Sequence, residues 1–395
     1  MKFLFINSVC GIRSTGRICT DLAVMLEAKG HQVKIAYGRE TVPETYQRFA
    51  HRIESPIGVR LHALLARLAD ASGFGSRAAT RRFIRWIDAY DPDVIHLHNI
   101  HGYYLHLPLF FQYLRRSGKR ILWSFYDCWS FTGHCAHFDY IHCDKWLTGC
   151  GDCPQLADYP KSFTDRSRRN HRQKKALFTN IPRLGLIVPS EWMGQMVAHS
   201  YMQDYPVHLL PNGIDTDLFR PIPGDKEDGH YTVLAVASEW TAMKGIDYIN
   251  RLAETLDMQR YRMVVVGHIQ SDCSLHPAIH HIPRTNNVEE LCRLYTAADV
   301  FVNPTLQETQ GLTTVEAFAC GTPAVVFCSG GAAECVDDTC GIAVARGDFD
   351  ALRQGVEHIC EQKPFTPDAC RTKAETYNKD ARYQAFLELY EHLKP

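Results

Sequence analysis

Short apolar runs alternate with longer amphipathic stretches along almost all of the 395 residues. The runs are rich in β-branched and aromatic side chains, which indicates strands, and the stretches between them have helical spacing. Near-continuous apolar strands between helices are typical of parallel sheets covered on both faces. We therefore expect an α/β fold with two doubly wound, Rossmann-like parallel-sheet domains that face a cleft. The expected strands are Phe3–Ile6, Val33–Ala36, Val94–Leu97, Ile121–Phe125 and Leu184–Val188 in the first half, and Val207–Leu210, Val233–Ala237, Met263–Val266, Val300–Val302 and Ala324–Phe327 in the second.

The domain boundary is expected near 200–215, where the turn-rich Leu210-Pro211-Asn212-Gly213-Ile214-Asp215 occurs. Residues 1–205 then form the N-terminal domain, with a Cys-rich insertion at about 128–160 that fits neither the strand nor the helix period. Residues 206–376 form the C-terminal domain, and 377–395 form a terminal helix that crosses back to the N-terminal domain.

Composition narrows the class of protein. The chain is 45% hydrophobic and 22% charged, which excludes disordered and collagen-like chains. No apolar run reaches the roughly 18 residues of a membrane span, and 15 cysteines without an export signal argue against a secreted disulfide scaffold. We expect a cytoplasmic protein.

Charge divides the chain into two unlike halves. Residues 1–205 carry 27 Lys and Arg against 17 Asp and Glu, whereas 206–395 carry 16 against 27. The basic half should attract anions, such as phosphate groups or an acidic membrane surface. No nucleic-acid-binding motif is present, so we expect no nucleic-acid partner.

The most informative segment is 303–323, which follows an expected strand and enters a short helix. Glu308 lies in the turn and Glu316 in the helix. Gly311 allows close backbone approach, and the N–H groups of Gly311, Leu312 and Thr313 would form an anion cradle. An alternative for Glu316 is purely structural, because Thr313-x-x-Glu316 has the spacing of a capping box.

This segment resembles the signature of the family 4 retaining glycosyltransferases, which have the GT-B fold. The signature is two glutamates separated by seven residues, and it continues here as Glu316-Ala317-Phe318-Ala319-Cys320-Gly321-Thr322-Pro323. Further matches are Pro211–Pro221, Pro189-Ser190-Glu191-Trp192, Ala298-Asp299-Val300-Phe301 and Asp93–His98.

The resemblance implies a retaining glycosyltransferase of the hexosyltransferase type, in polysaccharide or glycoconjugate biosynthesis. Glu316 would hold the ribose hydroxyls of a nucleotide-diphosphate sugar, and Glu308 would face the donor sugar. The amides at 311–313 would bind sugar hydroxyls or the diphosphate, and Lys244 would neutralise the leaving diphosphate. The reaction would need no catalytic metal and no protein nucleophile. The acceptor would be a saccharide or a lipid-linked saccharide, bound by the N-terminal domain.

The resemblance also covers the first domain. Gly16 belongs to a segment, Gly11–Arg17, similar to the family's glycine loop facing acceptor and diphosphate. His98 ends an expected strand and is placed to meet the acceptor. Asp127 matches the aspartate of the family's His-Asp pair, whose histidine is Tyr126 here.

A second departure concerns the diphosphate. The family's arginine, about five residues before the lysine, is replaced here within Ala237-Ser238-Glu239-Trp240. Arg284, or Arg13 and Arg17, could supply the missing charge.

Two other classes stay open. A nucleotide-sugar epimerase shares the architecture, and an inactive sugar-nucleotide-binding protein would result if these two departures had removed activity.

The insertion suggests a structural zinc site. Its four candidate ligands are Cys135, Cys143, Cys150 and Cys153, and the last two form a Cys-x-x-Cys pair. Four thiolates satisfy tetrahedral zinc, and metal binding can order a loop that has few aliphatic residues. The alternative is a set of reduced thiols or a redox pair.

A helical stretch in the basic half suggests membrane attachment. The apolar residues on one face of this stretch are Ile57, Leu61, Leu64, Leu65 and Leu68, and Arg60 and Arg67 lie nearby. The separate run 166–175 is strongly basic. The helix either packs into the core or attaches the protein peripherally to anionic lipid at the inner face of a membrane.

Overall fold

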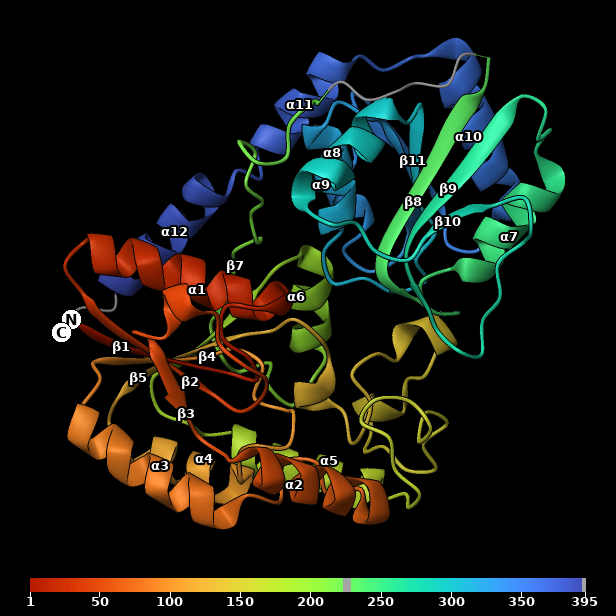
Figure 1. Ribbon diagram of the computed structural model, residues 1–395. Helices are drawn as coiled ribbons and strands as arrows, with labels where there is room; N and C mark the ends of the chain where they lie inside the picture. Colours follow the sequence, from red (N-terminus) through yellow and green to blue (C-terminus); the bar gives the residue numbers. More distant parts are fainter. Residues whose placement is uncertain (223–228, 393–395) are drawn as a thin grey trace. The chain divides into compact units, whose positions relative to one another are not determined.

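The computed structural model describes residues 1–222 and 229–392, which form two compact units. Unit 1 comprises 1–210 together with the chain from Phe386 on, and unit 2 comprises Pro211–Ala385 (Figure 1). Each unit holds one parallel sheet flanked by helices, so the expected α/β class with two parallel-sheet domains is confirmed.

Unit 1 has a seven-stranded sheet in the order β3-β2-β1-β4-β5-β6-β7. Helix α1 covers one face, and α2 to α5 lie on the opposite face (Figure 1). The strands are β1 (Lys2–Asn7), β2 (Gln32–Tyr37), β3 (Ala50–Arg52), β4 (Val94–Leu97), β5 (Arg120–Ser124), β6 (Leu184–Val188) and β7 (Val207–Leu209). The helices are α1 (Arg13–Ala28), α2 (Pro56–Ala69), α3 (Arg77–Tyr90), α4 (Leu107–Arg116), α5 (Ser167–Phe178) and α6 (Glu191–Ala198).

Unit 2 has a six-stranded sheet in the order β10-β9-β8-β11-β12-β13. The strands are β8 (Tyr231–Trp240), β9 (Tyr261–Ile269), β10 (His280–Ile282), β11 (Val300–Asn303), β12 (Ala324–Cys328) and β13 (Gly341–Ala345). The helices are α7 (Ile246–Thr255), α8 (Val288–Ala297), α9 (Leu312–Ala319), α10 (Phe349–Gln362), α11 (Pro367–Glu375) and α12 (Lys379–His392).

Continuous apolar strands form because both faces of each sheet are covered. On β11, Val300 and Val302 pack into one core of unit 2, whereas Phe301 packs into the core on the other side of the sheet. Successive side chains of a strand point to opposite faces, so neither face can be polar.

Two differences from expectation concern the ends of unit 1. Strand β7 pairs with β6, with Leu186 beside Val207, so the first sheet runs past residue 205. Helix α12 starts at Lys379, and the expected helix residues 393–395 lie outside the described part of the chain. From Phe386 on, α12 packs in unit 1, where Phe386, Leu387 and Tyr390 are buried.

His96 ties α12 to the sheet of unit 1. Its Nδ1 lies 2.6 Å from the hydroxyl of Tyr390, and its Nε2 lies 2.8 Å from Oγ of Ser124. The Tyr390 ring also packs against Phe3, with ring centroids 5.0 Å apart. Strands β1 and β4 are therefore covered in part by a helix that is distant in sequence.

The Cys-rich insertion contains only short 3-10 turns, at Trp129–Phe131, Asp139–Ile141 and Lys145–Leu147. Aromatic side chains hold these turns together. Phe131, Phe138 and Trp146 are buried and pack on one another, with ring centroids 4.8 to 6.2 Å apart. The insertion therefore has a small core that continues into that of unit 1.

Candidate functional site

In unit 2, hydrogen bonds bring the loop after β8 against the loop after β11. The Leu306 amide donates to the carbonyl of Met243 at 2.8 Å. Gly245, at φ +80°, lets the chain pass Pro304, because a Cβ there would lie 2.1 Å from the Pro304 carbonyl oxygen. These contacts fix the backbone on both sides of Lys244.

Lys244 and Glu308 meet across these two loops. Lys244 Nζ lies 2.5 Å from Oε2 of Glu308, and about a quarter of each side chain is exposed. The backbone of Glu308 is also held, since its carbonyl accepts from the Gly331 amide at 2.8 Å. The arrangement presents a solvent-reachable ion pair on a fixed backbone, at the carboxyl end of β11.

Glu316 is not part of a capping box. The N-cap of α9 is Gly311 rather than Thr313, and no side chain caps this helix end. Instead, the hydroxyl of Tyr295 on α8 donates to Oε2 of Glu316 at 3.1 Å. Burial and the adjacent carboxylate raise the pKa of Tyr295 well above its usual value, so Tyr295 keeps its proton and remains a donor.

The three amides expected as an anion cradle are not equivalent. The Leu312 amide already donates to the Gln310 carbonyl at 3.0 Å. Gly311 is buried, and a Cβ there would lie 3.1 Å from the Ala332 carbonyl oxygen. Thr313 belongs to the first turn of α9, where amides have no intrahelical acceptor. Glycine at 311 therefore fits a tightly packed position, and the Leu312 amide is already used by the backbone.

Arg284 is an exposed residue two positions after β10. Arg13 of unit 1 forms an ion pair with Glu40 at 2.8 Å, so its charge is already partly neutralised. Gly16 lies inside α1 and is buried, where a Cβ would lie 3.0 Å from Cγ2 of Val9. Glycine at this position thus packs closely on the turn after β1.

In unit 1, His98 and Asp127 line one polar cavity, at the carboxyl ends of β4 and β5. His98 Nδ1 lies 2.9 Å from the Tyr126 hydroxyl, while His98 Nε2 is buried with no hydrogen-bond partner. Burial lowers the pKa of His98 to about 3, so the imidazole is neutral. A neutral ring with one nitrogen left over can bind a hydroxyl group.

Asp127 is held by a chain of hydrogen bonds. Its Oδ2 lies 2.7 Å from His101 Nε2, and its Oδ1 accepts from the Trp129 amide at 2.9 Å. Burial opposes ionisation of Asp127, yet the charge and hydrogen bond of His101 lower its pKa overall. The other nitrogen of His101 lies 3.0 Å from the hydroxyl of Tyr159, which the Cys-rich insertion provides.

His101, Tyr159 and Tyr295 were missed in the sequence analysis. His101 follows His98 after the same strand, so its position gave a signal that could have been used. Tyr159 and Tyr295 come from segments distant in sequence from their partners, and no local pattern marks them.

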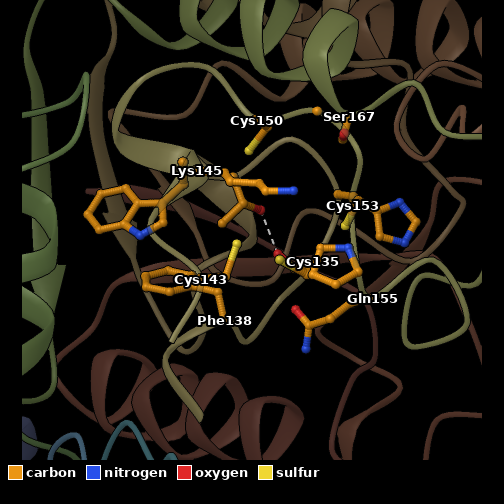
Figure 2. Close-up of a pocket in the computed structure, with 13 residues that line it drawn as sticks. Cys135, Phe138, Cys143, Lys145, Cys150, Cys153, Gln155 and Ser167 are labelled. Carbon is orange, nitrogen blue, oxygen red and sulfur yellow. Dashed lines mark hydrogen bonds between the residues drawn. The ribbon is translucent and has the colours of Figure 1, made fainter. Parts of the chain in front are cut away.

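The four cysteines proposed as zinc ligands line one cavity of the insertion (Figure 2). However, among the described residues no group of three or more His, Cys, Asp or Glu side chains is arranged to hold a metal ion, so the zinc prediction is not supported. Instead, the neighbouring Cys135 thiol favours the thiolate of Cys153 and lowers the pKa of Cys153 to about 7. Burial raises the pKa of Cys150 to about 11.

The comparisons with known proteins match both units. The model described as "Glycosyltransferase Family 4" matches residues 15–218, and the one described as "Glycosyl transferases group 1" matches 230–362. The putative colanic acid biosynthesis glycosyl transferase WcaC of Escherichia coli is 34% identical over 134 residues, which are 31% of this chain and 32% of WcaC.

Solved structures share the fold over the whole chain. Sucrose-phosphate synthase from Thermosynechococcus elongatus has a TM-score of 0.70 at 17% identity, covering 99% of this chain and 98% of that one. HepE from Anabaena, in complex with UDP-glucose, has a TM-score of 0.67 at 14% identity, covering 99% and 100%. The fold is thus the GT-B class of the solved glycosyltransferases.

Proposed function

Because this chain belongs to glycosyltransferase family 4, we propose that it transfers a glycosyl group from a nucleotide-diphosphate sugar to the hydroxyl of a saccharide or lipid-linked saccharide, with retention of configuration. Such a reaction would serve polysaccharide or glycoconjugate biosynthesis, the role that WcaC has by name. The observation that carries the proposal is the contact of Lys244 with Glu308 on the strand–turn–helix segment that also bears Glu316.

In unit 2 the donor would lie along this segment. Glu316 would accept hydrogen bonds from the ribose hydroxyls, because a carboxylate suits a vicinal diol. Glu308 would face the sugar, and Lys244 would turn from Glu308 to the leaving diphosphate. A nucleotide-sugar donor is supported by HepE, which has the same fold and was solved with UDP-glucose. Arg284 would add the charge that the family's missing arginine does not provide.

In unit 1 the acceptor hydroxyl would bind in the cavity lined by His98 and Asp127. The unpartnered Nε2 of His98 and the ionised Asp127 are two of the polar groups that line this cavity. The leaving diphosphate would itself take the proton from the incoming hydroxyl on the same face of the sugar. The protein would contribute placement and stabilisation of the departing charge.

A lipid-linked acceptor would place the protein at the inner face of a membrane. Within the described residues no helix is both long and apolar enough to cross a bilayer. We therefore propose peripheral attachment, which the basic character of residues 1–205 supports.

Release of nucleoside diphosphate tests the proposed reaction. A panel of nucleotide sugars is first screened by thermal shift, since a ligand at 100 times its Kd adds about 2.7 kcal/mol of stability. The donor that binds is then incubated with saccharide acceptors, and NMR determines the anomeric configuration of the product. Acceptor-dependent release with retention is expected.

Other outcomes identify the other classes. Interconversion of the sugar without acceptor would indicate an epimerase, and binding without turnover on any acceptor would indicate an inactive sugar-nucleotide-binding protein. A product with inverted anomeric configuration would contradict the proposed mechanism, although the protein would still be a glycosyltransferase.

A further inference from the structure

Helix α2 exposes an apolar face that the core does not use. Of its 14 residues, only His62 and Ala66 are buried. The side chains that a core-packed helix would bury are 42 to 69% exposed: Ile57, Leu61, Leu64, Leu65 and Leu68. The packing alternative for this helix is therefore wrong for these five residues, and a contiguous apolar face of this kind marks an interaction surface.

The segment that directly follows the Cys-rich insertion extends this face. The Phe163 amide donates to the carbonyl of Arg67 at 2.8 Å, and the Thr164 hydroxyl donates to that of Leu68 at 2.8 Å. Phe163 is thereby fixed beside α2, where its ring is 74% exposed and contacts the guanidinium of Arg67. A second chain segment thus adds the most exposed aromatic side chain to the surface.

Positive charge surrounds the apolar face. Helices α2 to α5, on one side of the unit 1 sheet, contain 13 Lys and Arg but a single acidic residue, Asp88 (Figure 1). Lys174 is buried, whereas Arg60, Arg81 and Arg169 are examples of the exposed ones. Such charge attracts an anionic surface, and it would make two copies of this face repel each other.

We infer that α2 and Phe163 form a docking surface for an anionic phospholipid bilayer, with the exposed leucines entering the headgroup boundary and the arginines meeting the lipid phosphates. An in-plane amphipathic helix with apolar and basic residues binds membranes in this way. The inference does not depend on the transfer reaction, because it concerns a different surface from the candidate site.

The docking surface and the acceptor cavity share one short segment. Tyr159 contacts His101 in the cavity, and Phe163, four residues later, lies against α2. A lipid-linked acceptor at the membrane surface would therefore start close to the cavity of unit 1.

Vesicle sedimentation tests the docking surface with the full chain. The protein is expected to sediment with phosphatidylglycerol–phosphatidylcholine vesicles and not with phosphatidylcholine alone. At about 1 M salt, where the Debye length is about 3 Å, binding should weaken without vanishing, because the apolar contribution remains. Absence of binding to the anionic vesicles at low salt would overturn the inference.

Variants localise the binding. Leu61→Gln with Leu65→Gln should weaken partitioning at least tenfold, and Phe163→Gln alone should weaken it by a smaller factor. The matched control is Val24→Gln with Leu218→Gln, two exposed apolar residues elsewhere that should have no effect. An equal loss of vesicle binding in the control variant would contradict the assigned surface. Wild-type dimers that the changes at Leu61 and Leu65 dissociate would contradict it as well. Binding of polyanionic RNA that resists these changes, with no vesicle binding, would also contradict it.

Discussion

At the scale of single residues, the carboxylate of Glu308 should determine turnover more than binding. Its Oε2 lies 2.5 Å from Lys244 Nζ, and about a quarter of the side chain is exposed. Glu308 can therefore reach a sugar without being needed for the fold. Glu308→Gln should lower turnover by at least 100-fold while changing nucleotide Kd by less than about threefold, equivalent to less than about 1 kcal/mol. The exposed Glu254→Gln is the matched control. Wild-type turnover in Glu308→Gln would remove this residue from the site.

Glu316→Gln should act on affinity. The amide keeps one acceptor for Tyr295 but loses the charge that would hold the ribose hydroxyls. A lost charged hydrogen bond costs about 1–3 kcal/mol, so the Kd for nucleoside diphosphate should rise roughly 5- to 150-fold by titration calorimetry. An unchanged Kd would mean that Glu316 only orders α8 against α9.

Residues within one sequence motif were the ones that sequence reasoning could identify. Glu308, Glu316 and Gly311 follow one strand, so their spacing shows that they share one turn and helix. His101 and Tyr159 meet although 58 positions separate them, and that contact depends on how the insertion folds back. Site roles for all of these residues stay predictions until the variants are measured.

At the scale of elements, the insertion should respond to oxidation. Cys135 and Cys153 line the same cavity, and the neighbouring Cys135 lowers the pKa of Cys153 to about 7, which makes Cys153 the more reactive thiolate. Mild treatment with diamide should join them in a disulfide, with two electrons and two protons passing to diamide. Peptide mapping after alkylation should find this pair. The exposed Cys328→Ser should keep the cross-link, whereas Cys153→Ser should abolish it, and a different pairing would contradict the assignment.

Interior strands were predictable because burial on both faces requires continuous apolar runs, as in β4 and β6. The edge strands β3, β10 and β13 were missed. β3 and β10 have three residues each, with polar side chains such as His51 and His281, so no apolar run marks them. In the insertion, the spacing of the cysteines suggested a metal site. The positions of these cysteines in the structure depend on the packing of aromatic side chains, which the cysteine spacing does not encode.

At the scale of the whole molecule, unit 1 should lose stability in mild acid. Burial lowers the pKa of His62 to about 4 and of His98 to about 3, and that of His96 well below its usual value. The unfolded chain, with a histidine pKa near 6.5, therefore binds protons first. The contribution of these neutral histidines to the free energy of unfolding is fully present above about pH 6.5. Below that pH it decreases, by at most about 1.4 kcal/mol per pH unit for each histidine.

Urea unfolding followed by tryptophan fluorescence between about pH 7 and pH 5 measures this loss. His62→Gln should flatten the pH dependence, because the His62 Nε2 that accepts from Gly73 and Gly75 is the group that resists protonation. The exposed His199→Gln should leave it unchanged. An unfolding midpoint that rises toward pH 5 would contradict the argument.

The contact of Tyr390 with His96 has a consequence for biosynthesis. On the ribosome, β1 and β4 are made early, the whole of unit 2 is made next, and only then do the residues from Phe386 on emerge. Until that moment His96 and Phe3 lack the aromatic cover that Tyr390 gives them, so part of one face of the unit 1 sheet is uncovered throughout translation of unit 2. A released chain truncated before residue 386 should therefore bind hydrophobic chaperones more strongly, and resist proteases less well, than the chain of 395 residues.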